Sequence, residues 1–300
     1  MRTAAKHVTK ILAALLATAI TAHALPPAAT NYAQDRAERA KALTAPYGWF
    51  SLIALNWLKP GITTVGSAKD NSIVLAGAPA HLMTLEQKNE KVTLLAADPS
   101  LVLPGNAAAA SHPVIADDNE GDKGAMKSGT LHMWAINRGN QRYLRVMDSQ
   151  SPSLKHFHGL NWYAPNPHYV VEARWIPYST PHTLKVVNKL GQTSMIPVPG
   201  YAEFELDGKK FSLIPMEAGG DGLEFVFRDL TARETTDGGG RFLDTALPSA
   251  GLNKPGKLLL DFNEAVNPPC AYTPYATCPL ASPENRLPIA VPAGEKRYED

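Results

Sequence analysis

The sequence predicts a mainly β protein with one short helix near its N-terminus. After residue 45, short runs of β-branched, aromatic and aliphatic residues alternate with Gly, Pro, Asn and Asp, and no helical periodicity separates them. Such a succession is typical of sheets that form sandwiches or barrels, not of alternating strands and helices. An Asp-Gly pair between two apolar runs adds a tight antiparallel hairpin.

The first 24 residues have the features of a secretory signal peptide. Three basic residues precede an apolar run at residues 11–20, and Ala22-His23-Ala24 offers small residues at both recognition positions. The run is too short to span a bilayer as a mature helix, and Leu-Pro-Pro follows Ala24 instead of a stop-transfer pattern. We expect cleavage after Ala24, a periplasmic or secreted protein, and no stable membrane anchor.

The charge balance argues against a nucleic-acid partner. The chain has 29 Lys and Arg against 28 Asp and Glu, and loss of the signal peptide removes three basic residues, which leaves 26. The sequence has no strong basic patch and no long run of like charge. We therefore expect neither nucleic acid nor an anionic membrane to bind through bulk charge.

A helix is expected first along the mature chain. Residues 32–43 combine apolar residues with an Asp-Arg-Ala-Glu-Arg-Ala-Lys surface, and Asn31 stands at the position of an N-cap. We expect residues 25–45 to form this helix and its linker.

Strands follow from residue 46 onward. Within one of them, Leu144 and Val146 favour an Arg145 that faces solvent; the alternative is a buried Arg145 that pairs with Asp148 or Glu172 and marks a polar pocket. Asp207-Gly208 supplies the positive φ angles of a two-residue turn. The expected strands are residues 50–55, 72–75, 91–96, 129–136, 142–147, 169–176, 182–187, 201–206, 209–214 and 223–227.

A polar break between residues 106 and 124 predicts a division of the chain. An Ala run is followed there by Asp-Asp-Asn-Glu-Gly-Asp, which is poor in large apolar residues. We expect a β-sandwich over residues 46–124 and a larger antiparallel β domain over residues 125–300. A long loop within a single domain is the alternative.

Long and unusual motifs give the chain a family resemblance. They lie in segments 46–58, 238–244, 261–263, 267–279, 284–287 and 293–296, and include Pro-Tyr-Gly-Trp-Phe-Ser-Leu and Asn-Pro-Pro-Cys-Ala-Tyr-Thr-Pro-Tyr. In these motifs the chain resembles the domain-of-unknown-function family 1684 over most of its mature length. The resemblance implies no agreed biochemical role.

A second resemblance covers residues 50–100. The segments 61–67, 71–75 and 81–82 are similar to strands of a forkhead-associated β-sandwich. Such domains carry an Arg where Ser67 stands, and a Ser-Arg or Ser-Ser step where Pro79-Ala80 stands. A neutral hydroxyl cannot form the bidentate clamp with which Arg holds phosphate. The resemblance therefore implies the fold and not phosphothreonine recognition.

Cys270 and Cys278 are the only two cysteines. An even number in an exported protein favours one disulfide, which would close a nine-residue loop. By chain entropy such a loop is worth about 2.5 kcal/mol. A reactive cysteine paired with a histidine is the alternative.

The Pro- and Cys-rich tail, residues 261–296, contains the candidate binding site, which we expect at the loop of residues 267–286. Its prolines fix φ and stiffen the chain, and rigid loops on a β scaffold suit binding. We expect its polar and aromatic side chains to surround a small polar or anionic ligand, or an envelope component. The alternative is that they tie an irregular tail to the sheet by satisfying backbone groups. The candidates are Arg241, Asp261, Asn263, Tyr272, Tyr275, Glu284, Asn285, Arg286, Glu295 and Lys296.

Two other functions stay open at this point. A hydrolytic enzyme would use Glu284 or Glu295 as its acid or base, and a structural interaction module would need no pocket. His156 and His158 would share a face of an extended segment, but a third ligand is lacking, so we expect no metal. Gly238-Gly239-Gly240 lacks the helix and the Lys-Ser/Thr step of a phosphate loop and predicts a turn. No hydrolase or dinucleotide motif is present, so no cofactor is expected.

Overall fold

The computed structural model describes residues 31–105, 111–115 and 125–299. The expected signal peptide and its cleavage site lie outside these residues, as does most of the polar break. From Tyr32 onward the chain belongs to one compact unit. Within the described part, no helix is both long and apolar enough to cross a membrane.

Helices contribute little to the fold, as the sequence predicts. Helix α1 (Tyr32–Leu43) has the predicted bounds, and α2 (Pro152–Lys155) is a single turn. Short 3-10 turns lie at Trp49–Ser51, Pro167–Tyr169, Phe262–Glu264, Pro269–Ala271 and Pro283–Asn285. All other regular elements in the described part of the chain are strands, so the mainly β fold is confirmed.

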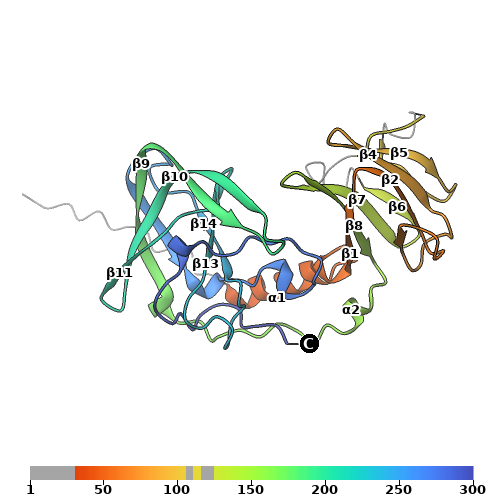
Figure 1. Cartoon of the computed structure of the whole chain (residues 1–300). Helices are drawn as coiled ribbons and strands as arrows, with labels where there is room; N and C mark the ends of the chain where they lie inside the picture. The colour runs from red at the N-terminus through yellow and green to blue at the C-terminus, as the bar shows by residue number, and fades with distance from the viewer. Residues whose placement is uncertain (1–30, 106–110, 116–124, 300) are drawn as a thin grey trace, which may run out of the picture. The chain divides into compact units, whose positions relative to one another are not determined.

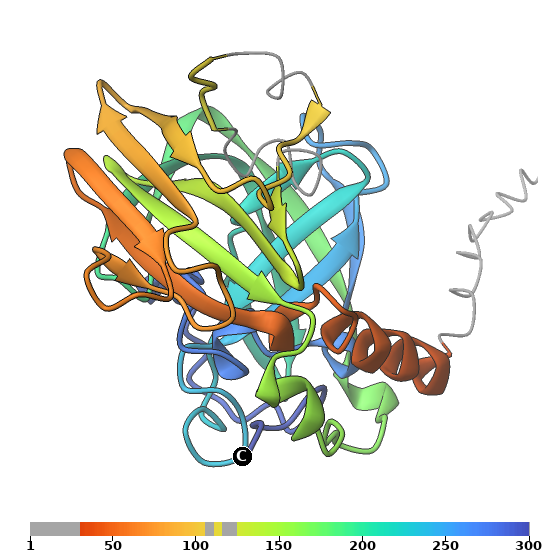
Figure 2. The same ribbon diagram turned by 90° about the vertical axis from the view of Figure 1, so that its right-hand side faces the viewer.

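Two sheets form the N-terminal sandwich (Figures 1 and 2). One has the order β1-β8-β7-β6, with β1 (Leu52–Leu58), β6 (Met126–Ser128), β7 (Leu131–Arg138) and β8 (Gln141–Asp148). The other has the order β3-β2-β4-β5, with β2 (Gly61–Gly66), β3 (Ile73–Val74), β4 (Met83–Lys88) and β5 (Lys91–Ala97). Buried side chains from both sheets form one core, which includes Leu58, Leu85, Met133 and Leu144.

The pairing of β1 with β8 joins strands from both sides of the predicted division. Leu55 lies opposite Arg145 in this antiparallel pair, although the polar break separates them in sequence. The division at residue 124 therefore stays a prediction, and the sandwich takes its first sheet from both sides of it. The resemblance to a forkhead-associated domain also stays a prediction.

Arg145 is buried, so the prediction that it faces solvent was wrong. Strand β8 is covered on both faces, because Leu144 packs in the sandwich core while Tyr143 packs on the opposite side of the sheet. The Arg145 guanidinium lies 5.6 Å from the ring centre of Trp49, at cation–π distance. The alternation of Leu144 and Val146 identifies only the face of β8 that packs in the sandwich core. It does not show that the opposite face, which carries Arg145, is covered as well.

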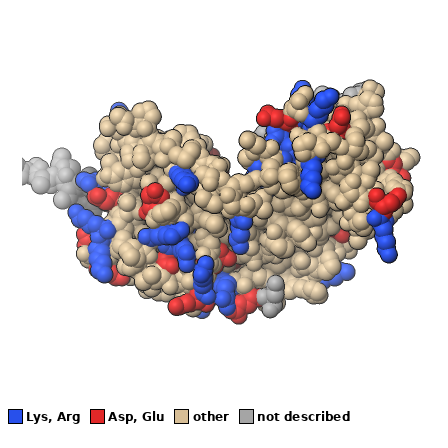
Figure 3. Space-filling model, in the orientation of Figure 1, with Lys and Arg blue, Asp and Glu red and all other residues tan. Residues whose placement is uncertain are grey.

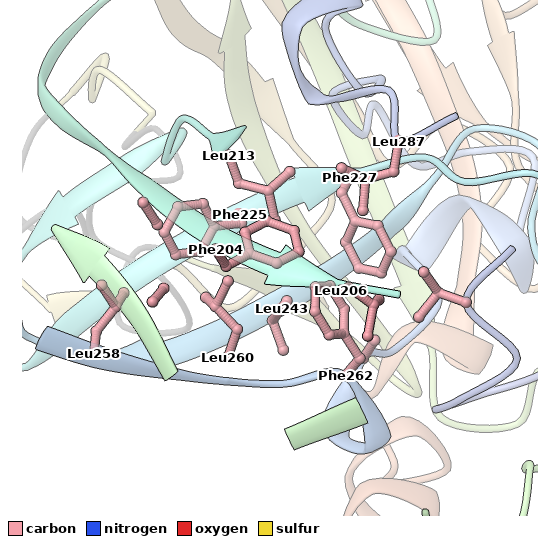
Figure 4. Close-up of a cluster of buried hydrophobic side chains, with 14 of the residues drawn as sticks. Phe204, Leu206, Leu213, Phe225, Phe227, Leu243, Leu258, Leu260, Phe262 and Leu287 are labelled. Carbon is pink, nitrogen blue, oxygen red and sulfur yellow. The ribbon is translucent and has the colours of Figure 1, made fainter. Parts of the chain in front are cut away.

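Two further sheets form the C-terminal part. One has the order β11-β10-β9-β15, with β9 (Val170–Val187), β10 (Thr193–Leu206), β11 (Lys209–Leu213) and β15 (Gly256–Asp261). The other has the order β12-β13-β14, with β12 (Glu217–Gly219), β13 (Gly222–Phe227) and β14 (Arg241–Ala246). Their inward faces share a core rich in Phe and Leu (Figure 4), which includes Phe204, Phe225, Phe227 and Phe262.

Strand β9 joins two strands that the sequence predicts as separate. Pro177 and Pro181 suggested a break, since proline cannot donate to a ladder. Strand β15 pairs with β9 only from Val170 to Trp175, so both prolines lie where β9 has β10 alone as a neighbour. One free side makes proline tolerable within a strand.

The predicted Asp-Gly hairpin is confirmed. Leu206 pairs with Lys209 across the turn, and Asp207 and Gly208 have φ angles of 53° and 68°. Positive φ at both central residues is the requirement of the type I′ turn.

Candidate functional site

Glu295 and Tyr272 are buried in a network that fastens the tail to α1. Arg39 donates from Nε to Glu295 Oε2 at 2.8 Å and from Nη2 to the Asn267 carbonyl oxygen at 2.7 Å. The Tyr272 hydroxyl donates to Glu295 Oε1, and the Asn267 N–H donates to Oε2 at 3.1 Å. Burial and the neighbouring Glu295 raise the pKa of the Tyr272 hydroxyl. Both carboxylate oxygens of Glu295 are therefore occupied by protein groups.

Asp261 and Asn263 form a second fastening network. The Tyr32 hydroxyl of α1 donates to Asp261 Oδ2 at 2.6 Å, and burial together with this bond raises the pKa of Tyr32 to about 12. Asp261 Oδ1 accepts from the Asn263 N–H at 3.0 Å. The Asn263 side chain in turn bonds both backbone groups of Asn166, at 2.9 and 3.0 Å.

Arg241 is buried inside the C-terminal part. Its guanidinium donates to the carbonyl oxygens of Ala293 and, at 2.9 Å, Val291, and pairs with Asp229 at 3.2 Å. Burial lowers the pKa of Arg241, and Asp229 opposes that effect. Arg241 thus satisfies carbonyl groups of the tail, as the structural alternative predicts.

Asn285 and Arg286 are neighbours with opposite placements. Asn285 is fully buried and bonds both backbone groups of Ile214 at 2.8 Å and the Val226 carbonyl oxygen at 3.0 Å. The next residue, Arg286, is exposed and forms a parallel bridge with Arg228. Because bridged residues project to the same side, the two arginine side chains leave the backbone together.

Arg286 lines an open cavity of about 490 Å³. Three more basic residues surround it: Lys189, Arg228 and Arg233. The remaining lining residues are the carboxylate Asp237 and the small or aliphatic Gly238, Gly239, Leu280 and Ala281. The volume falls in the range of small-molecule sites.

Three separate segments bring these charges together. Lys189 belongs to the turn between β9 and β10, and its N–H donates to the Cys278 carbonyl oxygen at 3.0 Å. Arg228 directly follows β13, where Phe227 points into the core and leaves Arg228 on the other side. Arg233 lies in a turn closed by its own N–H to the Thr236 carbonyl oxygen at 3.0 Å.

None of the four basic side chains has an ion pair among the described residues. Some exposed bases elsewhere lie beside acids, as Arg174 does with Glu203 at 2.7 Å and Lys257 with Glu172 at 2.7 Å, whereas others, such as Lys185, have no such pair among the described residues. Figure 3 shows basic and acidic side chains interspersed over much of one face. The cavity is therefore a local excess of positive charge on a protein that is nearly neutral overall.

The floor of the cavity is made of small residues. Gly238 lies under Arg233, because a Cβ there would come within 2.9 Å of Arg233 Cγ. Asp237 Oδ1 accepts from the Gly239 N–H at 2.7 Å, which closes the predicted glycine turn. Because Gly238 has no side chain, the side chain of Arg233 can lie against the backbone at this residue.

Tyr275, Glu284 and Lys296, the three candidates not yet described, also lie outside the set of residues that line this cavity. Tyr275 is exposed, Glu284 is exposed, and the Lys296 ammonium lies 4.8 Å from the ring centre of Tyr163. Of the ten candidates, Arg286 alone lines the cavity.

The two cysteines are adjacent and free in the structure. The Cys270 N–H donates to Cys278 Sγ at 3.2 Å. The hydrogen bond between the thiols, and then burial, raises the pKa of Cys270, while the same bond lowers the pKa of Cys278. The disulfide stays a prediction, and the geometry places the two residues side by side.

The histidines form no metal site within the described residues. His158 Nδ1 lies 3.2 Å from the His156 carbonyl oxygen, and its ring stacks on Tyr298. His168 lies 2.8 Å from Asp207 instead of near the other two.

A row of carboxylates crosses the β12-β13-β14 sheet and was missed in the sequence. Glu217 lies opposite Glu224, and Glu224 lies opposite Asp244. Burial, then Asp244 and Glu217, raises the pKa of Glu224 to about 7. Strand pairing creates this row, so only the correct register could have revealed it.

Comparison with known proteins places residues 155–296 in the family described as "Protein of unknown function (DUF1684)". The solution NMR structure of an uncharacterised protein from Haloarcula marismortui is 32% identical in sequence. The match covers 47% of this chain and 78% of that one, with a TM-score of 0.40. This chain belongs to the DUF1684 family. No curated protein matches it.

All the cavity-lining residues fall within the DUF1684 region. The motif at residues 46–58, which suggested a match over most of the mature chain, lies before that region. The basic cavity is thus a feature of the part of the chain that is shared with the DUF1684 profile.

Proposed function

We propose that this protein binds a small anionic ligand in the cavity around Arg228 and Arg286. The observation that carries the proposal is the set of four basic side chains that line one cavity, none of them in an ion pair among the described residues and with Asp237 as the single lining carboxylate. Ionic hydrogen bonds from Arg to an anion contribute about 1.5–3 kcal/mol each, more than neutral ones. An anion would satisfy charges that the protein itself leaves unbalanced.

The arrangement of the carboxylates favours binding over hydrolysis. Glu295 has both oxygens bonded inside the tail network, and Glu284 is not a lining residue of the basic cavity. A catalytic acid or base has to reach the ligand within hydrogen-bond distance. Neither carboxylate is placed to do so for a ligand bound there.

The expected signal peptide supports a ligand of the cell envelope or its surroundings. We propose export on the sequence pattern of residues 1–24 alone. The ligand would then be met outside the cytoplasm, as a free anion or as part of an envelope component.

Isothermal titration calorimetry of the full chain tests the proposal. The probes are sulfate, citrate, inorganic phosphate and pyrophosphate, each at one fixed ionic strength. We expect at least one to bind, and Arg286→Ala to weaken its affinity about 10-fold or more, given the strength of a charged hydrogen bond. Lys185→Ala is the matched control, because Lys185 is an exposed base of β9 outside the cavity.

Absence of binding by all four anions would refute the proposed function. So would an affinity that Arg286→Ala and Arg228→Ala leave unchanged, since binding would then occur elsewhere. Thermal melts of each variant show whether a loss of affinity reflects unfolding.

A further inference from the structure

The four basic residues divide into a pair and two separate cations. Arg228 and Arg286 are bridged side by side, with Arg228 N–H bonded to the Asn285 carbonyl oxygen at 3.0 Å and Leu287 N–H bonded to the Arg228 carbonyl oxygen at 2.7 Å. Lys189 and Arg233 come from two other turns. The bridged pair suits one anionic group, and the other two cations can bind a second one.

From this division we infer that the ligand carries two linked phosphoryl groups, as in a diphosphate. The inference rests on the proposed function, since it names the ligand class of the same cavity. Arg228 and Arg286 hold one phosphoryl group, and Lys189 and Arg233 hold the other.

The charge of the cavity matches two phosphoryl groups better than one. Four bases and the single acid Asp237 leave three positive charges in excess, and Asp237 already accepts the Gly239 N–H. A phosphate monoester carries about −1.5 to −2 at pH 7, which is less than the excess of three positive charges. A second, linked phosphoryl group adds negative charge and brings the ligand closer to balance.

The distribution of the donors favours phosphoryl over carboxylate groups. Arginine forks match both kinds of anion. The lining cations belong to separate segments of the chain. A tetrahedral phosphoryl group presents oxygens in several directions, whereas the oxygens of a carboxylate lie in one plane.

The remainder of the ligand has few contacts in this cavity. The described lining residues include no aromatic side chain, and the apolar contribution comes from Leu280 and Ala281. Base stacking requires an aromatic or guanidinium face, and the arginines are engaged by the anion. We therefore expect free pyrophosphate and a nucleoside diphosphate to bind with similar affinity.

Calorimetry with inorganic phosphate, pyrophosphate and a nucleoside diphosphate tests the inference on the full chain. Pyrophosphate should bind at least 10-fold more tightly than phosphate at the same ionic strength. Lys189→Ala should lower the affinity for pyrophosphate about 10-fold and leave that for phosphate within about 3-fold, in line with the energy of one charged hydrogen bond. Arg286→Ala should weaken both, and Lys185→Ala neither.

The outcomes separate this inference from the function on which it rests. If phosphate and pyrophosphate bind equally well and Arg286→Ala weakens both, the two-group inference is wrong and the anion site stands. If citrate or sulfate binds in an Arg286-dependent way and pyrophosphate does not, the phosphoryl assignment is wrong. If no anion binds, both proposals fail. A nucleoside diphosphate that binds far more tightly than pyrophosphate would overturn the inference that the two phosphoryl groups are what the cavity recognises.

Discussion

Replacement of Glu224 by Gln should stabilise the protein increasingly as the pH rises from 5 to 8. Glu224 stands in the middle of the carboxylate row, between Glu217 and Asp244 on the neighbouring strands. Burial, then these two neighbours, raises its pKa from the ordinary value of 4.5 to about 7. Gln keeps the size of the side chain and never ionises.

The magnitude follows from the two pKa values. Between pH 4.5 and 7 the folded protein keeps a proton on Glu224 that the unfolded chain has lost, so the free energy of unfolding falls as the pH rises. One pH unit corresponds to about 1.4 kcal/mol. Above pH 7 the ionised carboxylate therefore costs the folded state about 3 kcal/mol, and at pH 5 less than about 1 kcal/mol.

Urea unfolding at pH 5, 6, 7 and 8 measures the effect. The stability of Glu224→Gln relative to the wild type should grow by about 2 kcal/mol over this range. Glu205→Gln, at an exposed position of β10, serves as the control and should show no such trend. A difference between Glu224→Gln and the wild type that does not change with pH would refute the reasoning.

Three other predictions concern the tail and the N-terminus. Glu295→Gln leaves the Arg39 guanidinium without its carboxylate and should lower the free energy of unfolding by about 2–4 kcal/mol in urea titrations. Mild oxidation should join Cys270 and Cys278, which intact-mass measurement detects as the loss of two hydrogens and free-thiol labelling as the loss of two sites. Protein recovered after secretion should begin just after Ala24, and an N-terminus that still includes residues 1–24 would contradict the export proposal.

Local signals in the sequence predicted the elements that depend on local physics. The bounds of α1 follow from helical periodicity, and the turn at Asp207-Gly208 follows from positive φ, which few residue types adopt easily. The prediction for Arg145 was wrong because the tail covers the face of β8 that the alternation of apolar residues assigned to solvent. The sequence of a strand does not show what packs on it from elsewhere in the chain.

Of the residues that line the cavity, the sequence identified only Arg286 as a candidate. Arg286 lies in the tail, whose composition suggested a site, but Lys189 and Arg233 lie in turns and Arg228 at the end of β13, where the sequence has no distinctive motif. In the sequence each is one of many basic residues, and the pairing of Arg228 with Arg286 depends on a bridge between distant segments. The sequence contained one indication of the position of Arg228. The alternation of apolar residues up to Phe227 places the following residue on the opposite side of the strand from the core.

In the tail, a buried residue that anchors the backbone is directly followed by a residue that lines the cavity. The Asn285 side chain is buried and bonds the N–H and the carbonyl oxygen of Ile214, directly after β11, and the carbonyl oxygen of Val226 in β13. These bonds anchor the backbone, so the side chain of the next residue, Arg286, leaves it on the opposite side. Phe227 and Arg228 repeat the arrangement on the partner segment, one in the core and one in the cavity. An extended backbone makes this division unavoidable, since successive side chains leave it on opposite sides. In this tail the buried polar residues have partners that the fold supplies, whereas Arg286, for which we propose a role in binding, has no ion pair among the described residues.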